Sequence, residues 1–371
     1  MTTPGPSFLF LQYEKPLGTA VIATATLAAL RTRLPRAQIT VAAAGLPAEL
    51  LRESPLIDEL IVTPHAVDAF LPALLAGLRL RRRRFDYVVT DGGNRRTKVT
   101  AMALASGAAR RVGMAERNRL LHAAVDPDPR LSNLDNNLRI LDVLGYPGPP
   151  AEPQAHFSAQ ALAQAQTLLP EARGPRIAMV TQTSRGHPNA WFDDRWRDLA
   201  QHLVHDLGAT LVFLGTSGDA AAVDDLHSAA GPTAMSLAGR TPLPVLAAVL
   251  TQCDLAVTID TGTMHLARAV GTPMVILGNA AQPAHWWLPA ADPRYLVLRK
   301  DHVPCALCLR MACATRECMQ EIEVSEVAAA VAAQLRRYPA SAAARRARAE
   351  ARLSDRQGRT PDMAIPERTA V

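Results

Sequence analysis

LAVTIDTGTMHLARAVGTPMVIL, residues 255–277, is the stretch of this chain that decides its fold. Residues 255–259 predict a buried strand, and the polar turn from Asp260 to Thr263 leads into a helix. That helix ends at Gly-Thr-Pro (271–273), and residues 274–277 predict a second strand. The pattern is typical of a β-turn-α-β unit in a parallel sheet.

The turn formed by Asp260, Thr261, Gly262 and Thr263 has the composition of an anion site. The start of a helix presents N–H groups without intrahelical partners, together with the positive end of the helix dipole. Gly262 allows a ligand to approach the backbone, and the two threonines add hydroxyl donors. The turn therefore suits the phosphates of a nucleotide. A plain helix cap, with His265 packed in the core, is the alternative explanation.

The run Asp-Thr-Gly-Thr-Met-His-Leu-Ala, followed by a helix, Gly-Thr-Pro and a strand, resembles the donor site of the bacterial heptosyltransferases, glycosyltransferase family 9. The resemblance covers about residues 8–337 and assigns the turn, including Met264 and His265, to donor binding. It implies the GT-B architecture, in which two Rossmann-like, doubly wound α/β domains face each other across a cleft. It also implies a nucleotide-diphosphate sugar donor, usually ADP-heptose.

Composition narrows the class of protein. The 371 residues are enough for two domains, and an apolar content of 49% allows each to bury a core. No apolar run reaches the ~18 residues of a membrane-spanning helix. The first residues lack the basic segment of a signal peptide, so we expect a cytoplasmic protein. With 4% aromatic residues and a net charge of +6 spread along the chain, nucleic acid is not an expected partner.

The densest basic cluster consists of Arg79 and the four arginines at 81–84, at the end of a predicted helix. On one interpretation these cations solvate a helix C-terminus and complement its dipole. On the other they meet an anionic partner, either lipid headgroups at the inner face of the inner membrane or a phosphorylated glycolipid acceptor. The sequence leaves both interpretations open.

Apolar strands alternate with helical segments along the whole chain, which predicts parallel sheets covered by helices on both faces. The predicted strands are 8–11, 39–43, 60–62, 87–90, 177–181, 210–214, 255–259 and 274–277. The predicted helices are 20–33, a segment ending at 84, 193–207, 220–230, 243–251, 266–270 and 325–337.

Residues 146–153, rich in Gly and Pro, mark a linker. The predicted domains are therefore 1–150 on the acceptor side and 151–337 on the donor side, with ligands bound in a cleft between them. The Ala- and Arg-rich segment 338–371 cannot bury much apolar surface, so it predicts a frayed helix followed by disorder.

The loop after strand 177–181 contains Thr183, Ser184 and Arg185, which the resemblance places against the donor phosphates. Family members carry a lysine two residues before the matching tryptophan, and here that position is Asn189. The nearest cations are Arg185 and His187, so Arg185 is assigned the phosphate charge. An ordinary Ser/Thr-rich loop before a capped helix is the alternative.

Gly215 and Arg240 lie in two later turns that also resemble family segments. The resemblance implies that these turns form a wall around the base and ribose, and Arg240 is a second candidate cation for the leaving diphosphate. Taken alone, a glycine after a strand indicates only a turn.

The first strand-to-helix turn departs from the family pattern. Members carry Gly-Asp there, and the aspartate is the proposed base that takes a proton from the acceptor hydroxyl. Here Gly18 is followed by Thr19, which cannot act as a base near neutral pH. The candidate catalytic residues are therefore Glu14 and Asp91, for which loop solvation and an Asx-turn are the alternatives. The cation-rich loop from Asp91 to Lys98 resembles the acceptor-side segment.

Four of the five cysteines, Cys305, Cys308, Cys313 and Cys318, fall within 14 residues. Disulfides are not expected in a cytoplasmic chain, so the thiols either stay reduced or hold a structural zinc or iron. The spacing is tighter than that of common zinc ribbons, and the sequence does not decide between the two.

Together these observations predict an inverting glycosyltransferase that moves a sugar, most simply heptose from ADP-heptose, to a lipopolysaccharide core-type or lipid-linked acceptor. No cofactor is required if the helix N-terminus and the loop arginines neutralise the leaving diphosphate. The alternative is a degenerate member that binds nucleotide or glycan without transfer, because Thr19 and Asn189 replace the family Asp and Lys.

Overall fold

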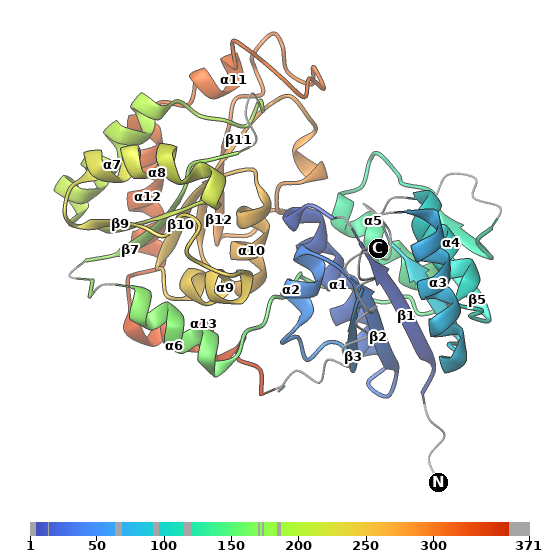
Figure 1. Cartoon of the computed structure of the whole chain (residues 1–371). Coiled ribbons are helices and arrows are strands. Elements are labelled where there is room, and N and C mark those ends of the chain that lie inside the picture. Colours follow the sequence, from blue (N-terminus) through green and yellow to red (C-terminus); the bar gives the residue numbers. More distant parts are fainter. Residues whose placement is uncertain are drawn as a thin grey trace, which may run out of the picture. The chain divides into compact units, whose positions relative to one another are not determined.

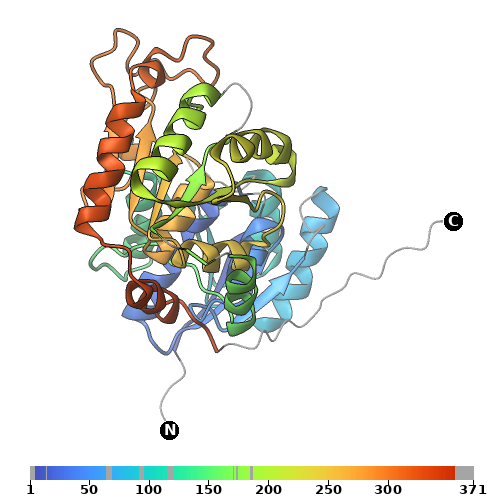
Figure 2. The same cartoon turned by 90° about the vertical axis from the view of Figure 1, so that its left-hand side faces the viewer.

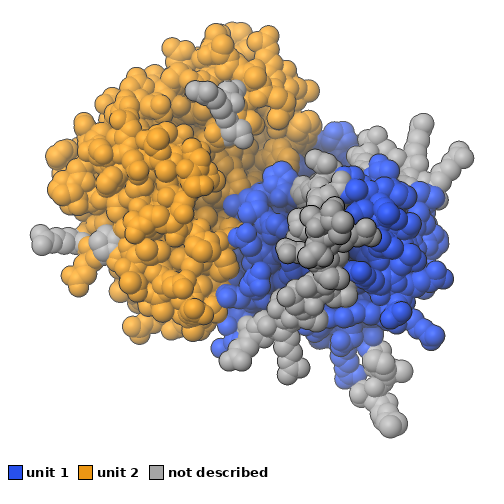
Figure 3. Space-filling model, viewed as in Figure 1, with its two compact units in different colours: residues 1–156, 354–371 blue, residues 157–353 orange. Residues whose placement is uncertain are grey.

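The computed structural model describes residues 5–13, 15–63, 69–91, 96–114, 120–169, 171–172, 174–183 and 187–355 (Figures 1 and 2). Two compact units are present, residues 1–156 with 354–371 and residues 157–353 (Figure 3). Each contains one six-stranded sheet in which every pairing is parallel. The predicted pair of doubly wound α/β domains is therefore confirmed.

Unit 1 has the strand order β3-β2-β1-β4-β5-β6. Its elements are β1 (Ser7–Gln12), α1 (Leu17–Arg33), β2 (Gln38–Ala43), α2 (Leu46–Leu51), β3 (Glu59–Val62), α3 (Phe70–Leu80), the 3-10 turn η1 (Arg81–Arg83), β4 (Tyr87–Thr90), α4 (Arg96–Ala105), β5 (Arg110–Met114), β6 (Ala123–Val125) and α5 (Asn133–Val143). Helices α3 and α4 pack side by side on one face of the sheet, and α1 packs against α5 (Figure 1).

Unit 2 has the equivalent order β12-β11-β10-β7-β8-β9. Its elements are α6 (Ala159–Leu168), β7 (Arg176–Val180), α7 (Asp193–Leu207), β8 (Thr210–Leu214), η2 (Ser217–Asp219), α8 (Ala220–Ala230), β9 (Ala234–Ser236), α9 (Leu243–Thr251), β10 (Leu255–Ile259), α10 (Gly262–Val270), β11 (Met274–Gly278), η3 (Ala284–Trp286), β12 (Tyr295–Arg299), α11 (Glu317–Gln320), α12 (Val324–Arg337) and α13 (Ala342–Glu350).

The core of unit 2 explains why its strands read as continuous apolar runs. Alternate residues such as Ile177 and Met179 of β7 face α7, α8 and α12, where Trp196 is completely buried. The intervening residues are also buried, because α9 packs with α6, α10 and α13. Strands covered on both faces lose the alternation of polar and apolar residues. All five residues of β10 are buried, so the packing of this strand fixes the position of Asp260 and Thr261, which follow it directly.

Residues 342–350 of the Ala- and Arg-rich segment, for which a frayed helix was predicted, form the helix α13. Ser341 caps this helix, and the Arg345 guanidinium donates 2.7 Å hydrogen bonds to the Asp254 carboxylate. Arg348 also donates to the Cys253 carbonyl. The arginines that suggested a solvated tail are thus anchored to the end of α9, and unit 2 extends to Leu353.

The two ends of unit 2 lie side by side. The Phe157 N–H donates a 3.2 Å hydrogen bond to the Arg352 carbonyl, and Phe157 forms a parallel bridge with Leu353. The division therefore falls at 156/157, a few residues beyond the predicted boundary at 150, and again at 353/354. None of the described helices is long and apolar enough to span a bilayer.

Candidate functional site

The predicted donor turn lies at the topological switch point of unit 2. Strands β7 and β10 are neighbours, and the chain proceeds from β7 to β8 on one side and from β10 to β11 on the other. Loops that leave the carboxyl ends of two such strands diverge, and ligands of open α/β sheets bind in the resulting crevice. The loop containing Thr183 follows β7, and the turn from Asp260 follows β10.

The start of α10 has the geometry of an anion site. Thr261 is the N-cap residue, and its hydroxyl oxygen accepts a 3.2 Å hydrogen bond from the Thr263 N–H. Gly262 begins the helix, so its N–H has no intrahelical acceptor. Residues 261–263 are half-buried at the end of a fully buried strand, whereas Met264 is completely buried. The side chain of Met264 thus belongs to the core.

Asp260 and His265 lie beside this turn in different protonation states. Burial raises the pKa of the Asp260 carboxyl to about 6, opposed by the charge of Arg299. Burial lowers the pKa of the His265 imidazole to about 3, and the charge of Arg268 lowers it further. The 4.0 Å approach of His265 Nε2 to the Asp260 carboxylate is therefore a contact with a neutral ring near pH 7. His265 Nδ1 is buried and has no partner among the described residues.

Asn189, at the position of the family lysine, holds the two loops of the crevice together. Its side-chain amide donates a 2.7 Å hydrogen bond to the Asp260 carbonyl and accepts one from the Asn279 amide. Asn279 Oδ1 in turn accepts from the Ala281 N–H at 2.7 Å. Asn189 is buried, so a neutral brace takes the place at which the family pattern has a cation.

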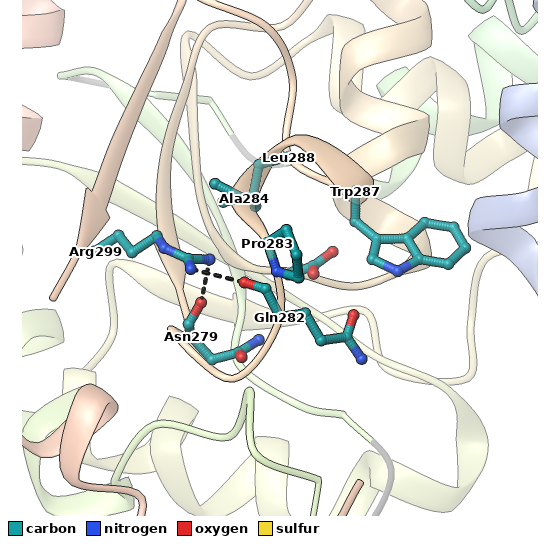
Figure 4. Close-up of a pocket in the computed structure, with 8 residues that line it drawn as sticks. Asn279, Gln282, Pro283, Ala284, Trp287, Leu288 and Arg299 are labelled. Carbon is teal, nitrogen blue, oxygen red and sulfur yellow. Dashed lines mark hydrogen bonds between the residues drawn. The ribbon is translucent and has the colours of Figure 1, made fainter. Parts of the chain in front are cut away.

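A small pocket opens beside the turn (Figure 4). The Arg299 guanidinium on one side of it donates 2.6 and 2.7 Å hydrogen bonds to the carbonyls of Asn279 and Gln282. The Trp287 ring stands edge-on to the His265 ring, with their centroids 6.1 Å apart. The pocket is lined by Asp260, Asn279, Gln282, Pro283, Ala284, Trp287, Leu288 and Arg299.

Apart from Asp260, these pocket residues were missed by sequence reasoning. Gln282 and Trp287 follow β11, and Arg299 ends β12. A usable signal was present, because residues just beyond the carboxyl ends of parallel strands meet at one edge of the sheet. The strand at 274–277 was predicted, but the segment after it contains no residue pattern that stands out.

The structure describes some of the remaining predicted donor residues but not all of them. Ser184 and Arg185 lie outside the described residues, and Thr183 is half-buried in the loop after β7. Burial lowers the pKa of His187, so this ring adds no charge near neutral pH. Gly215 follows β8, next to β7, whereas Arg240 follows the edge strand β9 and donates a 3.3 Å hydrogen bond to the Ser236 carbonyl.

The equivalent switch point of unit 1 is closed by a buried ion pair. Asp91 follows β4 and Lys15 follows β1, and both side chains are essentially inaccessible. One Asp91 oxygen pairs with the Lys15 ammonium, and the other accepts a 2.5 Å hydrogen bond from the Gln12 amide. Burial lowers the pKa of Lys15, and the Asp91 charge opposes that shift. Asp91 is thus committed to holding two strands together, which is a poor setting for a base.

The structure describes only some of the other residues discussed for the acceptor side. Glu14 and the loop at 92–95 lie outside the described residues. Thr19 lies in the first turn of α1 and is half-buried.

The four clustered cysteines lie between β12 and the start of α12. Cys305 contacts the Glu317 carboxylate at 3.8 Å, and the Cys313 sulfur accepts from the Arg316 N–H at 3.3 Å. Within the described ranges no three His, Cys, Asp or Glu side chains come together as a metal site would require. In this arrangement all five cysteines are free thiols.

The sequence matches the profile of "Glycosyltransferase family 9 (heptosyltransferase)" over residues 76–319, more than half of the chain. The chain belongs to this family. The resemblance identified from the turn at 260–266 is confirmed.

Curated relatives match a shorter segment. Lipopolysaccharide heptosyltransferase 2 of Escherichia coli strain K12 is 28% identical over 113 residues, 29% of this chain and 32% of that protein. The same enzyme of Salmonella typhimurium strain LT2 matches to the same extent. The matched segment spans about a third of the length of these relatives.

Solved structures share the fold over nearly the whole chain. A family 9 glycosyltransferase from Veillonella parvula DSM 2008 has a TM-score of 0.80 at 19% identity, covering 91% of this chain and 99% of that one. The E. coli ADP-heptose lipopolysaccharide heptosyltransferase II has a TM-score of 0.74 at 20% identity, covering 89% and 98%. These similarities confirm the GT-B fold class.

Proposed function

We propose that this chain is an inverting glycosyltransferase that moves a sugar, heptose from ADP-heptose, to a lipopolysaccharide core-type or other lipid-linked acceptor. The observation that carries the proposal is the N-terminus of α10, which opens at a switch point directly beside a pocket. Helix N–H groups suit a diphosphate, and the adjoining pocket suits the group attached to it. Family membership and the relatives described above support the choice of heptose.

The proposed reaction is a direct displacement at the anomeric carbon. The acceptor oxygen forms the new bond, the bond from the anomeric carbon to the diphosphate oxygen breaks, and the acceptor proton passes to a base. The N–H groups at the start of α10, with Arg185 as the cation, stabilise the charge that develops on the diphosphate. Because Asp91 is tied to Lys15 and Gln12, we assign the base to Glu14.

We further propose that the sugar enters the pocket beside Asp260. The Asp260 carboxylate and the Gln282 amide supply hydrogen-bond partners for sugar hydroxyls, and the Trp287 ring supplies an apolar wall. Gln282→Ala should therefore weaken binding of ADP-heptose while leaving binding of ADP unchanged. Equal losses for both ligands would contradict this placement of the sugar.

Calorimetry with ADP, adenosine and ADP-heptose tests the donor half. A side chain at Gly262 blocks the approach of phosphate to the helix start, so Gly262→Val should weaken ADP binding at least ~10-fold and adenosine binding little. The unfolding temperature of the variant serves as the folding control. Dissociation constants of the wild type above the millimolar range for both ADP and ADP-heptose would refute the proposal.

A second candidate function is binding of nucleotide or glycan without transfer. It is favoured by the buried, neutral Asn189 and by the engagement of both Asp91 oxygens. Intact donor binding without transfer or donor hydrolysis would support it, as would activity gained in Thr19→Asp. Transfer that is lost in Glu14→Ala, with binding retained, would instead support the enzyme and its base.

We place the enzyme in the cytoplasm and propose that transfer requires no metal cofactor, because the groups around α10 neutralise the diphosphate. Transfer that persists after dialysis against a chelator is the expected result. Elemental analysis of the purified protein tests the separate proposal of a structural zinc or iron at Cys305, Cys308, Cys313 and Cys318.

A further inference from the structure

Helix α3 of unit 1 carries an apolar face that no described element covers. Leu71, Leu75 and Leu78 recur at positions i, i+4 and i+7, and Phe70 precedes them. The three leucines are 61%, 46% and 44% exposed in that order, and Phe70 is 56% exposed. The opposite face of the same helix, with Ala73 and Ala76, packs into the core. Helix α3 is therefore apolar on two opposite sides. One side packs against the core of unit 1, and the other is exposed.

A basic cluster follows this outward face without a break. Arg79, Arg82 and Arg84 are exposed, and none has a partner among the described residues. Arg83 is paired with Glu59, and the Arg81 side chain lies against Gly107. From Phe70 to Arg84 the chain contains no carboxylate that could neutralise these charges.

We propose that α3 and the arginines that follow it, residues 70–84, lie flat on the surface of an anionic lipid bilayer. A helix with exposed apolar residues and a cluster of cations at its end binds in the interfacial plane, with its apolar side chains among the acyl chains and its cations at the phosphate groups. At 1.5 Å per residue, the 11 residues of α3 extend about 16 Å along that plane. This proposal adopts the interpretation in which Arg79 and residues 81–84 meet an anionic partner, and it holds whichever sugar the protein transfers.

Other occupants fit this face less well. A second copy of the chain would place an identical apolar and cationic face against it, and α3 offers no carboxylate to meet the arginines. A free phosphorylated glycan would satisfy the arginines but would leave Phe70 and the three leucines exposed to water. An anionic bilayer offers phosphate groups to the arginines and acyl chains to Phe70 and the three leucines.

Sedimentation of the full-length protein with vesicles tests the proposal. We expect binding to vesicles of phosphatidylcholine mixed with phosphatidylglycerol, weak binding to phosphatidylcholine alone, and loss of binding as salt is raised. Leu71→Ser with Leu75→Ser should lower the partition coefficient at least ~10-fold. Because each arginine near an anionic surface raises partition roughly fivefold, Arg79→Gln with Arg82→Gln should lower it about 25-fold.

Matched controls come from exposed residues in loops and turns elsewhere in the chain. Leu120→Ser with Leu309→Ser, and Arg36→Gln with Arg52→Gln, remove the same chemistry elsewhere and should leave binding unchanged. All sites are exposed, so unfolding temperatures should stay at the wild-type value. The proposal is overturned by absence of binding to anionic vesicles, or by equal losses in the α3 and control variants. It is also overturned if the leucine variants change only the mass of the protein in sedimentation equilibrium, because a second copy then covers the face.

Discussion

The two units share one topology but use their switch points differently. In unit 1 the loops after β1 and β4 are joined by the charged pair Lys15 and Asp91, which fills the position where the strand order reverses. In unit 2 the loops after β7 and β10 are joined by the neutral amide of Asn189, which binds a backbone carbonyl. The helix start and the Asp260 side chain are thereby left beside a pocket. Topology supplies the crevice, and the residues after the strands decide whether it stays open beside a pocket or is closed by a pair of side chains.

Breaking the charged pair should have the largest effect. Asp91→Asn leaves the buried Lys15 ammonium without its counter-ion, so we expect a loss of about 3–5 kcal/mol in the free energy of unfolding. Chemical denaturation measures it. The double variant Lys15→Met, Asp91→Leu removes both charges and should recover most of the loss. An Asp91→Asn protein that is stable yet inactive in transfer would instead identify Asp91 as the base.

Breaking the neutral brace should cost less stability but should affect binding. Asn189→Ala leaves the Asp260 carbonyl and the Asn279 amide without their partner, so we expect a loss of about 1–3 kcal/mol together with weaker ADP binding. Asn136 is the matched control, because its side chain bridges the backbone N–H and carbonyl of Asp128 in unit 1. Asn136→Ala should lower stability without changing ADP affinity.

Comparing the starts of α10 and α1 should reveal a smaller effect on stability. Thr261→Val keeps the shape of the side chain but removes the oxygen that accepts from the Thr263 N–H, so we expect a loss of about 1 kcal/mol in the unfolding free energy. Thr19→Val at the start of α1, where no side chain caps the helix, should change stability by less than about 0.5 kcal/mol. Equal losses in both variants would show that the cap is not specific to unit 2.

The pH dependence of stability should be modest in the wild type, since Asp260 and His265 act in opposite directions. The folded-state pKa of Asp260 is raised to about 6, so protonation below pH 6 favours the folded state. The pKa of His265 is lowered to about 3, so below its usual 6.5 the unfolded state gains protons first and stability falls. Between pH 7 and pH 5 these contributions amount to about +1 and −2 kcal/mol, which leaves a net loss of about 1 kcal/mol.

Two variants separate these contributions. Relative to the wild type over the same pH interval, His265→Gln should gain about 2 kcal/mol and Asp260→Asn should lose about 1 kcal/mol. Urea denaturation at pH 7 and pH 5 gives both numbers. Shifts of the same sign in the two variants would mean that the two side chains do not titrate as their burial implies.

The fold was largely predictable because apolar periodicity is a local property. The helix at 193–207 was predicted with the bounds that α7 has, since Trp196, Leu199 and Leu203 recur on one face. Helix α13 was not predicted as ordered, because its stability depends on Arg345 meeting Asp254, a partner 91 residues away. Pairings of this kind leave no periodic signal in the sequence.

The candidate site shows the same limit. The turn at 260–263 was recognised because the strand, the turn and the helix start follow one another directly along the sequence. The role of Asn189 could not be inferred, since its partner is a backbone carbonyl brought close by the sheet. Sequence comparison indicated only that a lysine was missing, whereas the structure shows what its replacement holds.

The bridge between Phe157 and Leu353 has a practical consequence for protein engineering. Both ends of unit 2 lie side by side, so residues 157–353 form a module with adjacent termini. Modules of this kind tolerate circular permutation and transfer into a loop of a host protein. Residues 157–353 can therefore be excised with α13 included, whereas a fragment cut at residue 337 would expose Asp254 and the end of α9 to water.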